Sequence, residues 1–154
     1  CLATLRQSTF CRGDGGFGPG DDSPDALPAV PGGKPDLQCE LRVPPSAALL
    51  YRLNADRNPL HADPDVAHQA GYPRPILHGL CSYGVAAHAI VKSCCDYDAS
   101  RLTSLNARFS APVYLGETLQ CDMWRMPDGQ IRFQVRARER DLVVMSHGTA
   151  TVQS

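Results

Sequence analysis

The most concentrated set of polar side chains lies in one short stretch of the chain. Asp56, Asn58 and His61 fall within six residues, and Pro59 stiffens the turn between the acid and the imidazole. A carboxylate and an imidazole that face one pocket can hold a water molecule between them, one accepting its proton while the other, protonated, donates elsewhere. Burial beside apolar side chains would raise the pKa of the carboxyl and separate the two roles. The spacing also allows a structural alternative, in which Asp56 caps a turn and His61 fills a surface groove.

A second candidate is Gly79, which opens an apolar helical pattern. The N–H groups in the first turn of a helix have no partner inside the helix, and glycine lets a ligand approach them closely. Such donors suit a carbonyl oxygen that gains negative charge during a reaction. The alternative is that Gly79 only relieves crowding against a neighbouring strand.

One helix and a sheet must position these residues. From Gly79 to Lys92 apolar residues recur at offsets of three and four and the other side is apolar too, so we expect the helix to be covered on most sides. Four strand-like runs follow, at 104–109, 119–124, 131–138 and 142–152, and a hairpin turn is expected at Pro127-Asp128-Gly129. A buried helix followed by an antiparallel meander predicts an α+β domain whose sheet wraps the helix.

The chain before this helix divides into two parts. Residues 1–36 are rich in glycine and proline and are expected to be irregular and flexible, apart from a short strand at Arg6–Arg12. Residues 37–154 would form the domain, beginning with a strand at Leu37–Val43. Ser46 is expected to cap a short helix, and Asp63-Pro64 to cap and open a second one.

Composition excludes two classes of function. The 154 residues carry 15 basic and 16 acidic side chains, a net charge of -1, which leaves no basic surface for nucleic acid. The longest run without charge, Pro75–Val91, is too short and too polar to insert in a membrane. Seven cysteines without a C-x-x-C pair favour free thiols in a reducing, intracellular compartment over a secreted disulfide scaffold. Because the chain opens with Cys1, we expect a piece of a longer polypeptide.

Three ordered motifs then give a family resemblance. They are Y-R-L-N-A-D-R-N-P-L-H-A-D-P at 51–64, A-G-Y-x-x-P-I-L-H-G-L-C at 70–81 and A-R-F-S-A-P-V-Y-L-G-E-T-L-Q at 107–120. Together they resemble the (R)-specific enoyl-CoA hydratases, or hydratase 2, of the MaoC-like hot-dog families, a type also found in the peroxisomal multifunctional enzyme of fatty-acid β-oxidation. The resemblance runs from about Ser8 to Val152, nearly the whole chain.

The resemblance implies a single hot-dog fold and a reaction. Water would add reversibly and syn to a trans-2-enoyl-CoA, giving a (3R)-3-hydroxyacyl-CoA. Asp56 and His61 would activate the water, Asn58 would help to orient it, and the Gly79 N–H would bind the thioester oxygen. The implied substrate site comprises Asp56, Arg57, Asn58, Pro59, Leu60, His61, Gly79 and Phe109. No metal or organic cofactor is implied, since coenzyme A arrives as part of the substrate, and the implied location is the peroxisome, although Thr151–Ser154 is not an S-K-L signal.

Two departures from the family pattern bear on this expectation. The pair before the catalytic Asp is Asn54-Ala55, where the family usually has Ser-Gly. Eukaryotic hydratase 2 also resembles two hot-dog repeats in one chain, of which this sequence matches only the second. We therefore expect it to form a homodimer or to pair with a second hot-dog repeat.

Two rival functions stay open. An acyl-CoA thioesterase on the same fold would hydrolyse the thioester, although the D-x-N-P-L-H motif at 56–61 argues against it. An acyl-CoA-binding or assembly unit would turn over little substrate, because half of its tunnel is missing.

Several other residues are expected to have structural rather than catalytic roles. The basic residues Arg132, Arg136, Arg138 and Arg140 are expected to form a solvated strand face, and Trp124 to lie at an interface. His88 and His147 sit in apolar runs and are expected to be core histidines. His61, Asp63, Asp65 and His68 superficially suggest a metal site, but their spacing does not place them on one helix face, so no metal is predicted.

Overall fold

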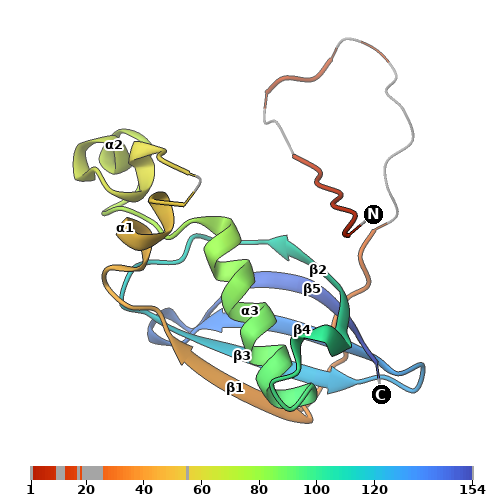
Figure 1. Ribbon diagram of the computed structural model, residues 1–154. Helices are drawn as coiled ribbons and strands as arrows, with labels where there is room; N and C mark the ends of the chain where they lie inside the picture. The colour runs from red at the N-terminus through yellow and green to blue at the C-terminus, as the bar shows by residue number, and fades with distance from the viewer. Residues whose placement is uncertain (1, 10–12, 17, 19–25, 55, 154) are drawn as a thin grey trace.

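One antiparallel sheet carries a long helix across one face (Figure 1). The computed structural model describes residues 2–9, 13–16, 18, 26–54 and 56–153. Its helices and strands are β1 (Leu37–Arg42), α1 (Ala47–Arg52), α2 (Pro64–Gln69), α3 (Gly79–Cys94), β2 (Leu102–Phe109), β3 (Thr118–Arg125), β4 (Gln130–Ala137) and β5 (Leu142–Val152). Three short 3-10 turns are η1 (Pro59–His61), η2 (Ala99–Arg101) and η3 (Arg138–Arg140). The strand order β1-β3-β4-β5-β2 makes β1 and β2 the edges of the sheet.

The predicted α+β hot-dog arrangement is confirmed by the alternation of the central strands. In β4 every second residue is buried, from Ile131 to Ala137, and the neighbouring β3 buries Leu119, Cys121 and Met123. These side chains join Ala86, Ala89 and Ile90 of α3 in one core. Burying one face of a period-two strand against a helix fixes the register of the sheet, since a slip by one residue would expose the whole set.

The helix α3 begins at the predicted residue and runs two residues further than expected, to Cys94. The expectation that it is covered on most sides is wrong for this chain by itself. Ser82, Ala86, Ala89 and Ile90 are buried, whereas the opposite face is open and leaves Leu80 57% exposed. Among the described residues, no helix is both long and apolar enough to cross a membrane.

Local turn chemistry behaves as expected at two of three sites. Asp63 caps α2 by accepting hydrogen bonds from the backbone N–H groups of Asp65 and Val66, and Pro64 takes the first helical position. The turn between β3 and β4 closes with the Gly129 N–H donating to the Met126 carbonyl at 3.0 Å, with Gly129 at φ 79°. Ser46 does precede α1, but its side chain makes no capping hydrogen bond.

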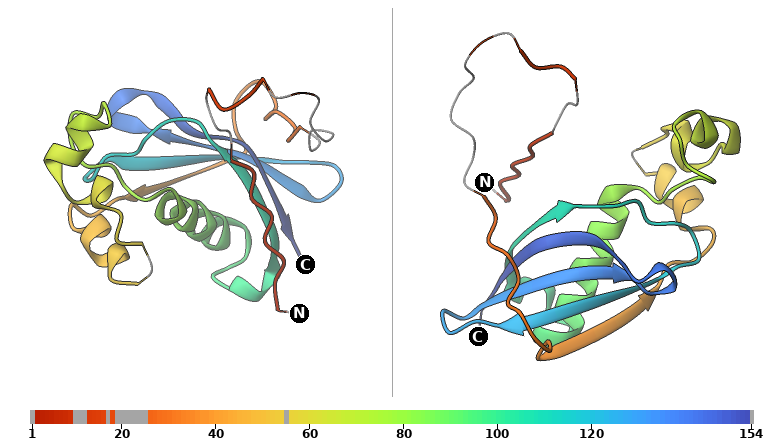
Figure 2. Two further views of the ribbon diagram at one scale, coloured as in Figure 1. Left: turned by 90° about the horizontal axis from the view of Figure 1, so that it is seen from above. Right: turned by 180° about the vertical axis from the view of Figure 1, so that it is seen from behind.

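The N-terminal segment differs from its prediction. Residues 2–9 form no strand, and the rest of the strand expected at Arg6–Arg12 lies outside the described residues. Figure 2 shows the segment before β1 crossing the face of the sheet opposite α3. It is tied to the sheet at Asp36, whose N–H donates to the Met123 carbonyl at 2.9 Å.

Three predictions about the environment of individual side chains are wrong. His88 is exposed rather than in the core, and His147 is half-buried in an irregular part of β5, with its ring against the Ser146 hydroxyl. Trp124 is not an exposed interface residue, because the chain itself leaves only 7% of it accessible. The four arginines form no single strand face, since β4 ends at Ala137 and the last two arginines lie in η3.

Five cysteines among the described residues are free: Cys39, Cys81, Cys94, Cys95 and Cys121. The vicinal pair Cys94 and Cys95 forms no bridge, as expected. Burial raises the pKa of the Cys121 thiol well above its usual range, so this side chain behaves as a small apolar group.

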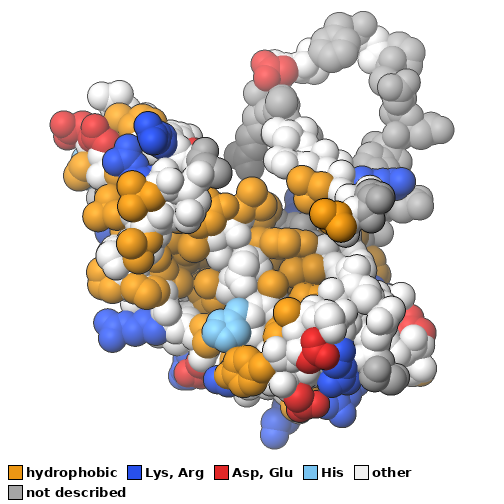
Figure 3. All heavy atoms as spheres, viewed as in Figure 1, with side chains coloured by type: hydrophobic (Ala, Val, Ile, Leu, Met, Phe, Trp, Pro, Cys, Tyr) orange, Lys and Arg blue, Asp and Glu red, His pale blue; other side chains and the backbone are white. Residues whose placement is uncertain are grey.

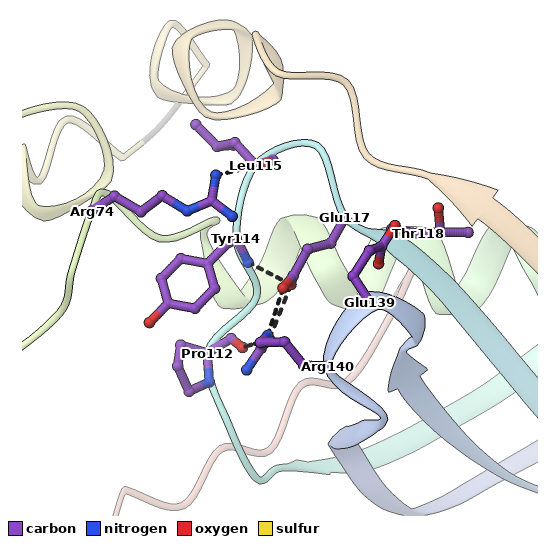
Figure 4. A network of polar contacts seen from close by, with 8 residues as sticks. All are labelled: Arg74, Pro112, Tyr114, Leu115, Glu117, Thr118, Glu139 and Arg140. Atoms are coloured by element: carbon purple, nitrogen blue, oxygen red, sulfur yellow. Dashed lines mark hydrogen bonds and ion pairs between the residues drawn. The ribbon is translucent and has the colours of Figure 1, made fainter.

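The loop from β2 to β3 is held by a buried ion pair (Figure 4). The Glu117 carboxylate, on a side chain 4% exposed, accepts from Arg140 Nε at 2.5 Å and Nη2 at 2.9 Å. It also accepts from the Tyr114 N–H at 2.8 Å, and Arg140 donates to the Pro112 carbonyl at 2.7 Å. The Tyr114 ring lies 4.9 Å from the guanidinium carbons of both Arg140 and Arg74. This network fixes the conformation of residues 112–117.

Removing the cation from this network should destabilise the fold. We expect Arg140→Met to lower the free energy of unfolding by about 2 kcal/mol, somewhat less than for a fully buried pair because Arg140 is 27% exposed. The matched control is Arg138→Met, which breaks the exposed pair with Glu40 and should cost about 0–1 kcal/mol. Urea unfolding followed by circular dichroism measures both. Equal losses in the two variants would contradict this account of the loop.

A second prediction concerns the close approach of β5 to β4. A Cβ added at Gly148 would lie 2.5 Å from the Phe133 carbonyl oxygen, whereas a Cβ at Gly84 of α3 would meet open space. We expect Gly148→Ala to destabilise the protein by about 1–3 kcal/mol through this overlap. Gly84→Ala should be neutral or stabilising by up to about 1 kcal/mol, because alanine favours a helix. Thermal unfolding distinguishes the two, and an unchanged melting temperature for Gly148→Ala would refute the predicted overlap.

Candidate active site

The loop between α1 and α2 holds the predicted catalytic pair. The Asp56 carboxylate accepts a hydrogen bond from the Asn58 N–H at 3.0 Å, and the Asn58 side chain accepts from the Leu60 N–H at 3.1 Å. These two contacts turn the chain sharply into η1, which ends at His61. The local structure thus brings an exposed carboxylate next to a histidine that is 8% exposed.

Hydrogen bonding sets the protonation pattern of the His61 ring. Its Nδ1 lies 2.8 Å from the Ile76 carbonyl oxygen, which can only accept, so Nδ1 carries a proton. In the neutral ring Nε2 is then a free acceptor. A carboxylate oxygen of Asp56 and a ring nitrogen of His61 lie within 4.8 Å of each other. A water hydrogen-bonded at about 2.8 Å to each would fit between them.

A second histidine, His78, packs directly against this pair. It is 1% exposed, its ring stacks on the His61 ring with centroids 3.8 Å apart, and Tyr51 covers it at 4.6 Å. Its Nε2 lies 3.1 Å from the Asp56 carbonyl oxygen, while its Nδ1 is buried and has no hydrogen-bond partner among the described residues. Burial lowers the pKa of His78, with the nearby His61 and Arg52 acting in the same direction.

Asp56, His61 and His78 also form a group that could hold a metal ion, with one potential ligand atom from each within 4.8 Å of the others. The two rings stack face to face with centroids 3.8 Å apart, and one nitrogen of each ring already bonds to a backbone carbonyl. The cluster weighed from the sequence is not assembled among the described residues. Asp63 caps α2 and His68 bonds to the Pro73 carbonyl.

A pocket of about 400 Å³ opens beside His61. It is lined by His61, Tyr72, Ile76, Leu77, Gly79, Ser82, Phe109, Ser110, Ala111, Pro112, Val113 and Val144. Most of this wall is apolar, and part of it belongs to the loop that the Glu117–Arg140 pair holds. The cavity can therefore accept an apolar chain with a polar group near His61.

Three predicted site residues, His61, Gly79 and Phe109, line this pocket together. Gly79 begins α3 there, and a Cβ added to it would sit 3.6 Å from the Phe109 ring, an ordinary contact. Glycine is thus not demanded by a clash inside the chain, so its bare backbone leaves room for a ligand at the first-turn N–H groups. The alternative that Gly79 relieves crowding against a strand is not supported.

The other predicted residues lie outside the pocket wall. Asp56 adjoins it through His61, whereas Arg57 lines a separate hollow of about 230 Å³ with Arg52 and Leu53. Asn58, Pro59 and Leu60 build the turn itself. Their contribution to substrate binding stays a prediction.

Sequence reasoning missed residues that only the fold brings to the pocket. Tyr72 and Ser110 lie within the motifs at 70–81 and 107–120 but received no role from them, and Val144 lies in no motif. His78 had a signal, because it directly precedes Gly79 in the I-L-H-G-L motif, but no role followed from its position alone.

Comparison with known proteins agrees with this geometry. A family model described as "MaoC like domain" matches residues 27–147. The enoyl-CoA hydratase ChsH3 of Mycobacterium tuberculosis is 45% identical over 98% of this chain and 52% of its own length. The peroxisomal enoyl-CoA hydratase 2 of Arabidopsis thaliana is 41% identical over 94% of this chain and 50% of its own length.

A solved structure gives the same result for the fold. The crystal structure of a MaoC-like dehydratase from Phytophthora capsici superposes with a TM-score of 0.83 and 39% identity, covering 86% of this chain and 47% of that chain. This chain thus spans about half the length of the relatives it matches. The resemblance seen in the three motifs is confirmed: the chain belongs to the MaoC-like domain family.

Proposed function

We propose that this chain catalyses the reversible syn addition of water to trans-2-enoyl-CoA, giving (3R)-3-hydroxyacyl-CoA in fatty-acid β-oxidation. The observation that carries the proposal is the Asp56 carboxylate close to the His61 imidazole, which lines a largely apolar pocket. Relatives that match nearly all of this chain are named enoyl-CoA hydratases, which supports the same reaction.

In the proposed mechanism, the pair divides the work on one water molecule. One group accepts a proton as the water oxygen bonds to the β-carbon, and the other delivers a proton to the α-carbon on the same face. A proton passing between them restores the starting state. The thioester oxygen gains negative charge as the double bond is consumed, and the Gly79 N–H at the start of α3 stabilises it.

The apolar wall accounts for binding of the acyl chain. Ile76, Leu77 and Val113 present hydrocarbon to the pocket, and burying each methylene of a fatty acyl chain contributes about 0.8 kcal/mol. Coenzyme A enters as part of the substrate, and we propose that the reaction requires no metal or organic cofactor. A peroxisomal location is part of the proposal and rests on names such as that of the Arabidopsis relative.

The second candidate function is an acyl-CoA-binding or assembly unit with little turnover. The observation that favours it is that the chain spans only about half of its relatives, while Asp56 is exposed. A thioesterase has less support, because water held by the Asp56–His61 pair is directed at the alkene in the proposed binding mode.

We also propose that a second hot-dog repeat covers the open side of this domain, provided by a second copy when the chain is alone. Figure 3 shows hydrophobic side chains gathered on the face that carries α3. The large exposed ones on α1, α3 and β2 and next to α1 include Leu49, Leu50, Leu53, Leu80 and Phe109, each more than half exposed. The strand β2 is an edge of the sheet, with β5 as its one strand neighbour among the described residues.

The activity prediction is direct. We expect the chain to consume the enoyl-thioester absorbance of crotonyl-CoA and a decenoyl-CoA, with a product refused by an (S)-specific dehydrogenase. Chelation with EDTA should leave the rate unchanged. Asp56→Ala and His61→Ala should each lower kcat at least about a hundredfold, the usual scale for general acid–base groups.

The control variant is His68→Ala, which removes an exposed histidine of α2 whose ring bonds to the Pro73 carbonyl, outside the site. It should keep the rate of the unaltered chain. Retained activity in both Asp56→Ala and His61→Ala would refute the assigned pair. A folded, dimeric chain that binds acyl-CoA but leaves the absorbance unchanged would favour the second candidate function.

The proposed pairing predicts the molecular mass of the protein in solution. The 16.7 kDa chain should elute as a dimer in chromatography with light scattering. Leu80→Glu should shift it to the monomer, because a charge would be buried in the contact. Leu142→Glu changes an exposed leucine at the start of β5 that is not one of the five apolar residues named above, and it should leave the dimer intact. A monomer for the unaltered chain would contradict self-pairing.

A further inference from the structure

We propose that His78 is a positioning residue that fixes the positions of Asp56 and His61 relative to each other. Its Nε2–H donates to the Asp56 carbonyl, and its ring supports the His61 ring by stacking. The inference rests on the proposed hydratase function, since it assigns His78 a task in organising that catalytic pair.

The need for such a residue follows from the exposure of Asp56. The Asp56 backbone belongs to no helix or strand and lies in an exposed loop. A loop of this kind samples many backbone conformations unless tertiary contacts fix it. The hydrogen bond from His78, 22 residues further along the chain, ties the loop to the start of α3. This start is itself fixed by the core.

The hydrogen bond also fixes the tautomer of His78. A carbonyl oxygen can only accept, so Nε2 carries the proton and Nδ1 is bare in the neutral ring. Protonating Nδ1 would create a buried N–H without a partner, beside His61. Around the ring, His61 and Arg52 disfavour its charged form and Asp56 favours it, while burial is the largest influence and lowers the pKa. His78 is therefore neutral, and its Nε2–H stays a hydrogen-bond donor to the Asp56 carbonyl.

The stacking contact fixes the position of the His61 imidazole. His61 is held at Nδ1 by the Ile76 carbonyl and on its face by the His78 ring, two residues later in the chain. Gly79 follows at once and begins α3. The segment Ile76–Gly79 thus positions the acid, the imidazole and the helix N-terminus together.

His78 itself stays out of the reaction. Its neighbours Leu77 and Gly79 line the pocket, whereas His78 is not among the lining residues and is 1% exposed. A change at His78 should therefore misplace the pair without removing a substrate contact. Misplacement of reacting groups by about 1 Å can cost on the order of a hundredfold in rate.

The test separates the hydrogen bond from the ring. His78→Phe keeps a ring for stacking but loses the donor, and His78→Gln keeps an N–H near the Nε2 position. We expect His78→Phe to lower kcat about ten- to a hundredfold with KM within about twofold. His78→Gln restores the donor without the ring and should recover the part of that loss that the hydrogen bond causes. The matched control, His68→Phe, removes a histidine-to-carbonyl bond outside the site and should not change kcat.

An unchanged kcat in folded His78→Phe, or a loss confined to KM, would overturn the proposal. Thermal unfolding of each variant shows which are folded. If a variant fails to fold, the unaltered chain decides: its imidazole ¹⁵N spectra should show His78 neutral at about pH 7 and above, with its proton on Nε2. A charged ring, or a proton on Nδ1, would overturn the proposal.

A readout that does not depend on turnover separates this inference from the proposed function. The amide proton shift of Asn58 reports its hydrogen bond to the Asp56 carboxylate. It should move in His78→Phe and stay close to that of the unaltered chain in His78→Gln. If the unaltered chain hydrates no enoyl-CoA, the proposed function fails, while these shifts still decide whether His78 positions Asp56. An unmoved Asn58 shift in folded His78→Phe would contradict it.

Discussion

The packing of α3 against the centre of the sheet is the constraint on which the polar residues depend. Ala86, Ala89 and Ile90 contact a strand face whose alternate residues are all buried, so the helix has one rotation that buries its apolar side. That rotation fixes where the first turn of α3 begins. The direction of the Gly79 N–H and the depth of His78 follow from a hydrophobic contact made further along α3. The residues of that contact, Ala86, Ala89 and Ile90, contribute no polar group to the site.

The surface properties of this domain follow from the same packing. A helix that is apolar nearly all round can bury only one side against a single sheet, and the remaining side leaves Leu80 exposed. The pocket is also open to solvent, because Gly79 and Phe109 form part of its wall and both are exposed. In a chain that spans about half the length of its relatives, the open helix face and the open pocket are two consequences of one uncovered side.

Structural features that depend on a few neighbouring residues could be predicted from the sequence. The alternation in β4, the Asp63-Pro64 start of α2 and the turn at Gly129 each depend on a few neighbouring residues. The closeness of Asp56 and His61 is of this kind, because a six-residue segment brings them together. The stacking of His78 on His61 and the pocket wall at Val144 join distant segments, and no single-sequence periodicity encodes such contacts. The exposure of His88 was missed for a related reason, as an apolar neighbourhood in sequence does not tell which side of α3 is covered.

The relation between Asp56 and His78 shows why an exposed acid can have a defined position. An exposed carboxylate avoids the desolvation penalty of a buried one, but it loses the packing that would hold it in place. Here a neutral, buried histidine provides the anchor through the Asp56 backbone and leaves the carboxylate free to contact water. Burying the donor rather than the acid keeps the charge solvated and the geometry fixed. A second hot-dog repeat over the open side would then exclude bulk water from a pair that is already aligned.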